Sequence, residues 1–512
     1  MAAPRTETTR EPPAPTGVVE SFRYAFSSPT RLRKEVLAGL TVALALIPEA
    51  IAFSILAGVD PALGLFASVV MAITIAFTGG RPAMISAATG AVALVIAPVA
   101  REYGVDYFIA TVLLAGVLQV VLAALGVANL QRFIPRSVMT GFVNALGILI
   151  FTAQLEHLID VPKVVYVLVA AGIAIMIGWP KLTSAIPAPL ITIIVISAVV
   201  GLAGFRVPTV SDMGQLPDSL PRLFVPDVPL TLETLQTIAP YSLAMAIVGL
   251  LESLMTAKLV DDITDTHSDK TRESWGQGVA NIASGIFGGM GGCAMIGQTM
   301  INVRESGART RLSTLLAGVF LLAFILLLGD VVGQIPMAAL VAIMIMVSVG
   351  TIDWHSVHPR TLKFMPLSET VVMLVTVVAT LATSNLAVGV VLGVITAMIT
   401  FARRVAHLAS VEQVSAEDTT NDGQVDTRTY RIHGQLFWAS SNDLVYAFDY
   451  TDPAENIVLD LSAAEVWDAS TVATLDSVTR KFEERGKTVT IVGLDGPSKD
   501  RLDRLSGKLN SQ

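Results

Sequence analysis

A glycine-rich break interrupts the apolar part of this chain at Gly79-Gly-Arg-Pro-Ala-Met-Ile-Ser-Ala-Ala-Thr-Gly-Ala-Val-Ala93. The apolar segment that follows, residues 86–100, is too short to cross a bilayer. A second break, Gly291-Gly-Cys-Ala-Met-Ile-Gly-Gln-Thr299, leads into another short segment at residues 294–303. Short segments after such breaks, in matching positions of two halves, predict a binding site built from two broken helices.

Long apolar blocks surround these two segments and indicate a helical membrane protein. The 512 residues are 53% hydrophobic and only 15% charged, whereas soluble proteins carry about 25% charged residues. Blocks long enough to span a hydrocarbon core recur near residues 36–57, 61–78, 108–127, 137–156, 164–179, 186–204, 236–260, 274–289, 310–329, 335–352, 367–383 and 385–402. With the two short segments they make fourteen, seven on each side of the polar stretch 205–235. Because the short segment comes third in each half, we expect an inverted repeat over about 31–204 and 236–408.

Basic residues predict the orientation of this protein in the membrane. They flank the first and the last predicted spans, at residues 31–34 and 403–404. Positive residues accumulate on the cytoplasmic side, so both termini are expected there, in a multi-pass protein of the cell (inner) membrane. The polar, proline-rich residues 1–30 are expected to form a disordered cytoplasmic tail. Cys293 is the only cysteine, which excludes an intrachain disulfide.

The composition becomes that of a soluble domain after Arg404. A polar linker is expected at residues 411–423, followed by a small α/β domain over 424–512. Alternating and buried patterns in this domain predict three strands and one helix, at residues 429–434, 456–461, 488–493 and 472–485 respectively.

Glu252 lies in the middle of the apolar stretch 241–258. A carboxylate at bilayer depth is unfavourable and is expected to face a cavity or a partner. Thr256 follows on the same helix face, so the pair could hold Na⁺ through oxygens, or Glu252 alone could exchange a proton. A structural hydrogen bond to a neighbouring helix is the alternative. Glu49 follows a predicted kink at Pro48 and has the same two interpretations.

The two broken helices have a chemistry that suits an anion. The free N–H groups and the positive dipole end of a helix start attract negative charge. The small residues at 86–90 would let backbone approach a ligand closely, although tight helix packing is the alternative. No nucleophile–base pair, phosphate loop or metal-ligand cluster is visible, so neither an enzyme nor a cofactor is expected. Nothing in the composition suggests nucleic-acid binding.

The chain resembles the SulP family of anion transporters over nearly its whole length. Its C-terminal domain resembles the STAS domain of anti-sigma-factor antagonists. The motifs that carry these resemblances are Pro48-Glu-Ala-Ile-Ala-Phe53, Leu56-Ala-Gly-Val-Asp-Pro-Ala-Leu-Gly-Leu65, Asn302-Val-Arg-Glu-Ser-Gly-Ala-Arg-Thr310, Gly434-Gln-Leu-Phe-Trp-Ala439, Ile457-Val-Leu-Asp-Leu-Ser462 and Trp467-Asp-Ala-Ser-Thr471.

The resemblance implies a seven-plus-seven inverted repeat with core and gate subdomains, elevator-like alternating access and a cytoplasmic STAS domain that supports a homodimer. The anion would bind between the third and tenth segments. The residues implied to line this site are Ala52, Phe53, Thr89, Ala294, Met295, Ile296, Gly297 and Gln298. Glu252 and Thr256 match the position of the coupling ion, and Glu49 is a further candidate for it.

Three departures from the family pattern refine these expectations. Gln298 is a neutral amide where many relatives carry a basic or small polar residue, which argues against multivalent sulfate. Residues 80–90 and Glu49 look most like the bicarbonate-transporting branch, which uses Na⁺ and an Asp where this chain has Glu252. A Glu reaches further into the pocket, and burial favours its neutral form, so proton coupling is expected. Thr471 stands where a Gly is usual beside Ser470, so phosphoregulation of Ser470 is not expected.

The expected function is therefore proton-coupled symport of a small carboxylate or inorganic anion across the lipid bilayer. The alternatives are a Na⁺-coupled bicarbonate symporter and an uncoupled anion exchanger or channel. A membrane-anchored signalling protein, with the STAS domain as its output, is a third class.

Overall fold

The chain divides into two compact units, residues 1–394 and 395–512. The computed structural model describes residues 15–127, 134–182, 187–214, 220–406, 409–417, 426–441 and 444–508. The first is the helical unit and the second is the C-terminal unit.

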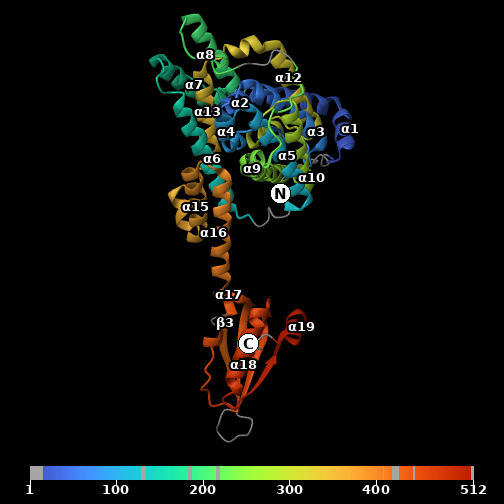
Figure 1. The fold of residues 1–512 in the computed structure, drawn as a ribbon, viewed down its shortest axis with the longest axis vertical. Coiled ribbons are helices and arrows are strands. Elements are labelled where there is room, and N and C mark those ends of the chain that lie inside the picture. Colours follow the sequence, from blue (N-terminus) through green and yellow to red (C-terminus); the bar gives the residue numbers. More distant parts are fainter. Residues whose placement is uncertain are drawn as a thin grey trace, which may run out of the picture. The chain divides into compact units, whose positions relative to one another are not determined.

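A helical segment occupies each of the fourteen predicted positions (Figure 1). The first half contains α2 (Pro29–Ala57), α3 (Pro61–Thr78), α4 (Gly90–Tyr103), α5 (Val105–Ala124), α6 (Arg136–Glu156), α7 (Lys163–Leu182) and α8 (Ala188–Ala203). The second half contains α9 (Leu232–Thr264), α10 (Lys270–Ile286), α11 (Ile296–Met300), α12 (Arg311–Gly333), α13 (Met337–Thr351), α15 (Leu367–Thr383) and α16 (Leu386–Ala406). Short pieces complete the described helices: η2 (Val210–Asp212), a π-helical turn η3 (Ile301–Glu305) and α14 (Pro359–Phe364).

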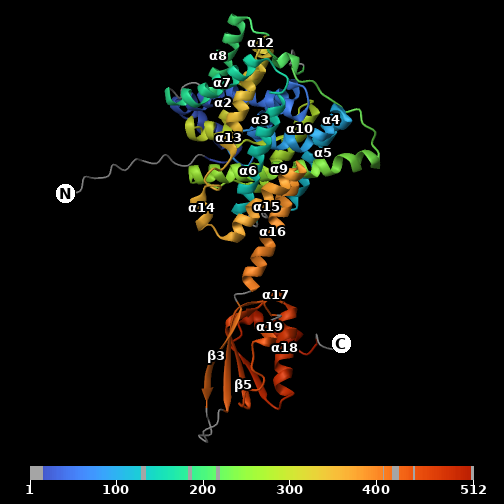
Figure 2. The same cartoon turned by 90° about the vertical axis from the view of Figure 1, so that its left-hand side faces the viewer.

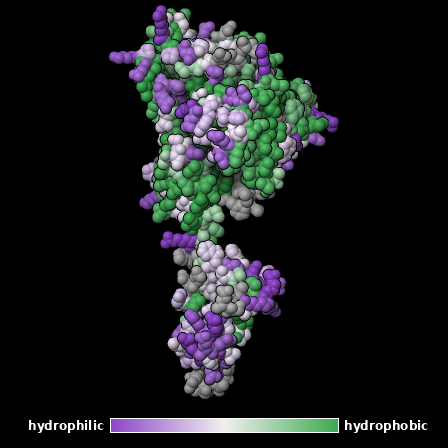
Figure 3. All heavy atoms as spheres, in the orientation of Figure 1, coloured by the Kyte–Doolittle hydropathy of each residue, from purple (hydrophilic) through white to green (hydrophobic). Residues whose placement is uncertain are grey.

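The apolar character of these helices fits a multi-pass membrane protein. Among the described residues, eight helices are long and apolar enough to cross a membrane: α2, α3, α5, α6, α7, α9, α12 and α16. Apolar side chains also cover broad areas of the surface of the helical unit (Figure 3). Val117 and Ile194, for example, are exposed, and large exposed apolar areas are typical of surfaces that contact a membrane. The fold class is as predicted, while the number of complete crossings stays a prediction.

Two short strands precede the broken helices and pair with each other. Strand β1 (Ser86–Ala88) is antiparallel to β2 (Gly292–Ala294), with Ala87 opposite Cys293. The predicted short helices therefore begin later than expected, at Gly90 and Ile296. The pairing places the starts of α4 and α11 side by side, although they are about two hundred residues apart in sequence.

The helical unit consists of two groups of helices that pack mainly among themselves. The core group is α2–α5 with α9–α12, and the gate group is α6–α8 with α13 and α15. In Figure 1 the gate group lies to the left of the core group. Small residues allow close crossings within a group: Gly116 of α5 and Gly278 of α10 each face the other's carbonyl oxygen, where an added Cβ would lie 2.8 and 2.6 Å away.

The amino-terminal part of the chain contains a helix where a disordered tail was expected. Helix α1 (Val18–Phe26) packs against the start of α12, where Ser21 Oγ accepts a hydrogen bond of 3.1 Å from the N–H of Arg311. The Phe22 and Phe77 rings stack at 5.7 Å. Contacts with neighbouring helices therefore accompany the order of residues 18–26, while residues 1–14 of the predicted tail lie outside the described part.

The C-terminal unit is a four-stranded sheet with helices on one face (Figure 2). Its strand order is β3 (Ser410–Glu417), β4 (Thr427–Leu436), β5 (Asn456–Val466) and β6 (Thr488–Val492). The β3–β4 pair is antiparallel and the other pairs are parallel. Buried apolar residues of β4 and β5 pack against α18 (Ala469–Glu483). The remaining described elements are α17 (Trp438–Ser441), η4 (Leu444–Tyr446) and α19 (Gly496–Leu505).

The sheet begins inside the segment that was predicted to be a linker. Residues 410–417 form β3, because their backbone pairs with β4 from Ser410 opposite His433 to Glu417 opposite Thr427. The sequence did not predict this strand, because its side chains are largely polar. An edge strand can be polar, since one of its faces is solvated. The rest of the expected linker, residues 418–423, lies outside the described part of the chain.

Candidate functional site

A cavity of about 390 Å³ lies between the core group and the gate group. Its core-side lining comes from α2, the start of α4, α9 and the segment 295–301: Glu49, Phe53, Thr89, Gly90, Ala91, Glu252, Met295, Ile296, Gly297, Gln298 and Ile301. Its gate-side lining comes from α6 and α13: Phe142, Val143, Leu146, Ile150, Val347, Gly350 and Thr351. The cavity therefore has the volume of a small-molecule site.

The starts of both broken helices open onto this cavity. Thr89 precedes α4 and Met295 precedes α11, and no side chain accepts a hydrogen bond from either first turn in the described chain. Unpaired N–H groups at a helix start, together with the helix dipole, form a ready site for negative charge.

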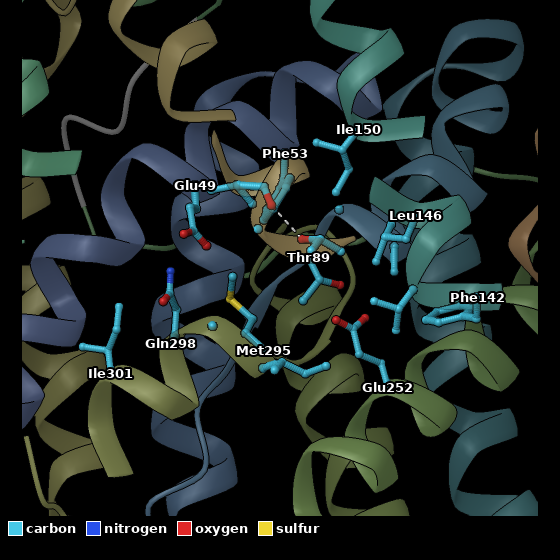
Figure 4. Close-up of a pocket in the computed structure, with 18 residues that line it drawn as sticks. Glu49, Phe53, Thr89, Phe142, Leu146, Ile150, Glu252, Met295, Gln298 and Ile301 are labelled. Atoms are coloured by element: carbon cyan, nitrogen blue, oxygen red, sulfur yellow. Dashed lines mark hydrogen bonds between the residues drawn. The ribbon is translucent and has the colours of Figure 1, made fainter. Parts of the chain in front are cut away.

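Gln298 supplies a polar side chain that points into the cavity. It is only 1% exposed. Figure 4 shows the amide of Gln298 directed toward the carboxyl group of Glu49, which lies next to it. The amide therefore interacts with the Glu49 carboxyl group, and a bound anion would offer its N–H a second acceptor.

Two carboxyl groups lie on the wall of the same cavity. Glu49 follows Pro48 inside α2, and Glu252 lies near the middle of α9 and is 8% exposed. Glu252 Oε2 accepts a hydrogen bond of 2.9 Å from the Cys293 thiol of β2. In the view of Figure 4 the two carboxyl groups approach the cavity from opposite ends, with Thr89 and Met295 between them.

The charge of the lining residues sets what this cavity can bind. None of the residues that line it is a Lys, Arg or His. Two unit charges of one sign about 4 Å apart repel by about 4 kcal/mol at an effective dielectric constant of about 20. An anion at the helix starts would therefore bind well only when the neighbouring carboxyl group is neutralised by a proton or a cation.

Most of the predicted site residues meet at this cavity, and three do not line it. Those that do are Phe53, Thr89, Met295, Ile296, Gly297 and Gln298, with Glu49 and Glu252. Ala52 is buried beside Phe53, and the N–H of Ala294 donates to Ser253 Oγ at 3.1 Å. The Thr256 hydroxyl donates to the carbonyl of Glu252 at 2.8 Å, so it is engaged within its own helix.

Sequence reasoning missed the gate-side lining and the contact between Cys293 and Glu252. The lining residues of α6 and α13 are mainly apolar, so nothing in their chemistry distinguishes them from residues that face lipid. The contact between Cys293 and Glu252 joins two elements of the fold. The one sequence signal for this contact was the position of Cys293 inside the second glycine-rich break.

A buried amide holds the strand pair behind the cavity. Asn281 of α10 contacts both polar groups of the Gly292 backbone: its Oδ1 accepts from the N–H at 2.9 Å and its Nδ2 donates to the carbonyl at 3.0 Å. Gln277 Nε2 donates to Ser86 Oγ of β1 at 2.6 Å. Both ends of the β1–β2 pair are thus fixed to one helix, which orients the two helix starts.

Comparison with known proteins decides the family. The sulfate permease family matches residues 32–171 and 164–376, and the STAS domain matches residues 417–507. The chain belongs to the sulfate permease family. It is therefore a multi-pass membrane protein of a family of anion transporters, and not an enzyme.

Similar proteins cover nearly the full chain of this permease family member. A putative sulfate transporter, YbaR of Bacillus subtilis strain 168, is 49% identical over 475 residues, which are 93% of this chain and 97% of the relative. The bicarbonate transporter BicA of Picosynechococcus is 26% identical over 521 residues, covering 93% of this chain and 91% of the relative. The structure of the murine anion transporter Slc26a9 in its inward-facing state superposes with a TM-score of 0.81 at 16% identity, over 96% of this chain and 90% of that one. This last likeness shows the shared fold.

Proposed function

We propose that this protein is a secondary active transporter that moves a small anion together with a proton. The observation that carries the proposal is the composition of one cavity: two open helix starts and a buried amide lie beside two carboxyl groups, with no basic side chain in the lining. The helix starts attract an anion, and the carboxyl groups repel it until a cation neutralises them. Binding of anion and cation is therefore mutually favourable, which is what symport requires.

A proton is favoured over Na⁺ as the coupling ion. Hard metal cations are held by several oxygen ligands, and the Thr256 hydroxyl, which could add one to Glu252, faces its own helix backbone. Glu252 has a thiol as its hydrogen-bond partner, and a thiol is a weak ligand for a hard cation. A single carboxyl group can carry a proton without further ligands. Na⁺-coupled transport is the alternative, and accumulation driven by a Na⁺ gradient alone would indicate it.

The substrate is inferred to be a small carboxylate or an inorganic anion such as bicarbonate. Backbone N–H groups and one amide bind a singly charged oxyanion, whereas divalent sulfate would gain from basic side chains that the lining lacks. Relatives at 49% and 26% identity carry the names of a putative sulfate transporter and a bicarbonate transporter. An uncoupled exchanger or channel is the other alternative, and it would leave Glu252 with a purely structural role.

The proposed mechanism is an elevator-like movement of the core group past the gate group. The division of the helices into two groups, with the cavity between them, supports it. Core-side residues supply the ion-binding groups, while the gate-side lining is mainly apolar and offers few polar groups that would hold the substrate back. Placement in the cell membrane with both termini cytoplasmic, and a homodimer, stay predictions.

Replacing Gln298 by Leu tests whether the anion binds at the two helix starts. The change removes the buried donor at nearly constant volume, so the KM for anion uptake into proteoliposomes should rise about tenfold, as expected for one hydrogen bond to a charged group. Ile301→Leu, on the same wall, keeps the volume and removes no donor, and should leave the KM within about twofold. An unchanged KM in Gln298→Leu would place the anion elsewhere.

A further inference from the structure

Three side chains form a hydrogen-bonded chain behind the cavity wall. Cys293 Sγ lies 2.9 Å from Glu252 Oε2 and 3.2 Å from Thr89 Oγ1. Glu252 and Thr89 line the cavity, whereas Cys293 is fully buried and does not. Thr89 is the residue from which α4 starts, so its hydroxyl lies at the site where the anion is proposed to bind.

We propose that Cys293 is a positioning residue that transmits the protonation state of Glu252 to the Thr89 hydroxyl, and thereby couples proton binding to anion binding. The inference rests on the proposed function and names the groups by which one site acts on the other. Its physical basis is the direction of the hydrogen bonds along the Thr89–Cys293–Glu252 chain.

With Glu252 ionised, every hydrogen in the chain points toward its carboxylate. A carboxylate only accepts, so the Cys293 thiol donates to Glu252 Oε2. The sulfur is then left as an acceptor, and the Thr89 hydroxyl donates to it. The hydroxyl hydrogen of Thr89 is thereby turned away from the cavity, and the hydroxyl presents only lone pairs to an anion, which is repulsive.

With Glu252 protonated, the chain can run in the opposite direction. The new carboxyl O–H donates to Cys293 Sγ, and the thiol hydrogen turns to Thr89 Oγ1 as its acceptor. The Thr89 hydroxyl hydrogen is then free to turn into the cavity and donate to the anion. No covalent bond breaks beyond the initial protonation, because each hydrogen stays on its own atom and only rotates. One proton on Glu252 thus removes a repulsive charge and adds a donor.

Few other titratable groups face Glu252. Glu49 of α2 is the other acid on the cavity, and Cys293 is the side chain that bonds to Glu252 directly. In the described part of the chain, α11 and α13 carry no titratable residue. Apart from Tyr241 of α9, those of the other neighbouring helices lie toward helix ends: Arg31, Arg33, Lys34 and Glu35 of α2, Arg101, Glu102 and Tyr103 of α4, Asp106 and Tyr107 of α5, Arg136 and Glu156 of α6, Glu233, Lys258, Asp261 and Asp262 of α9, and Lys270, Arg272 and Glu273 of α10.

The test compares Cys293→Ala with Cys293→Ser by measuring the KM for anion uptake as a function of pH. In the unaltered protein, the KM should fall strongly as the pH of the anion side is lowered from about 8 to about 6, within the about 5- to 150-fold range of typical site-to-site coupling. Cys293→Ala interrupts the chain and should weaken that dependence by about tenfold. Cys293→Ser retains a donor and an acceptor and should restore most of it.

Thr89→Val provides a second, independent interruption. It removes the hydroxyl at constant shape and should weaken the pH dependence of the KM as Cys293→Ala does, while the double variant should be no worse than either single one. A general packing defect would instead lower the maximal rate at every pH and would not be rescued by Ser. Monodisperse elution of each variant establishes that it folds.

The outcomes separate this inference from the proposed function. A strong pH dependence that survives unchanged in Cys293→Ala and Thr89→Val overturns the relay and leaves proton-coupled symport standing. An unaltered protein that shows no pH dependence of the KM and no proton-driven accumulation overturns the proposed function itself. A defect in Cys293→Ala that Cys293→Ser does not relieve also contradicts the relay.

Discussion

Glu252→Gln is expected to abolish concentrative anion uptake while leaving exchange of anion for anion across the membrane intact. The amide has the shape of a protonated carboxyl group and can neither bind nor release a proton. The cavity of this variant would therefore accept the anion over a wider pH range, because the repulsive charge of residue 252 is permanently absent. Without a proton to carry, movement of the anion is no longer tied to the proton gradient, so the driving force is lost.

The size of this effect follows from the energy of the gradient. One pH unit is worth about 1.4 kcal/mol, which supports about tenfold accumulation for one proton per anion in the absence of a membrane potential. In Glu252→Gln the accumulation ratio should fall to about one, while counterflow of labelled against unlabelled anion persists. Glu156→Gln, at the exposed end of α6, is the control and should accumulate normally. Glu49→Gln, tested in parallel, assigns the proton to one of the two acids on the cavity.

Proton-driven accumulation that survives in Glu252→Gln would contradict the assigned role. If Glu49→Gln alone removed it, the proton would reside on α2 and Glu252 would be structural.

Gly292→Ala is expected to prevent assembly of the site altogether. A Cβ at this position would lie 2.0 Å from the carbonyl oxygen of Ala87 and 2.6 Å from Met71 Sδ. The carbonyl belongs to the backbone of β1, so the strand pair must separate to admit the methyl group. The two hydrogen bonds between Asn281 and the Gly292 backbone would then be lost. Overpacking that moves backbone destabilises by about 1–3 kcal/mol and occasionally by more. We expect a lower midpoint of thermal unfolding, and uptake at background.

Gly201→Ala is the matched control for this prediction. It adds the same methyl group to a helical glycine, in α8, where no atom lies within 4 Å of the added Cβ. The change should leave uptake unaltered and raise the thermal midpoint slightly, because Ala has the higher helix propensity. Wild-type uptake and thermal stability in Gly292→Ala would show that the close β1–β2 pairing is not needed to hold the two helix starts.

The broken helices could be predicted because their signals are local. A run of glycines, an apolar segment too short to span, and its recurrence in the other half all stand in the sequence itself. Glu252 could also be predicted as a site residue from its local sequence, because a carboxyl group within an apolar stretch has few stable environments. Helix bounds followed as well: α3 and α15 begin and end where the apolar pattern places them.

The remaining features depend on contacts between distant parts of the chain. Cys293 reaches Glu252 only because β2 pairs with β1 beside α9. Phe142 and Val347 line the cavity because the gate group faces it, and their apolar side chains would be equally suited to lipid. Strand β3 and helix α1 are short and partly polar, so their order comes from their neighbours rather than from their own sequences.

The most direct test of the central claim measures uptake of radiolabelled bicarbonate, fumarate and sulfate into proteoliposomes that contain the unaltered protein. An inward proton gradient at equal Na⁺ is compared with an inward Na⁺ gradient at equal pH, each with the membrane potential clamped. Under proton-coupled symport, the proton gradient alone drives accumulation of a singly charged or small carboxylate anion, and the Na⁺ gradient alone drives none. Accumulation driven only by Na⁺, or equilibration without accumulation under both gradients, would contradict it.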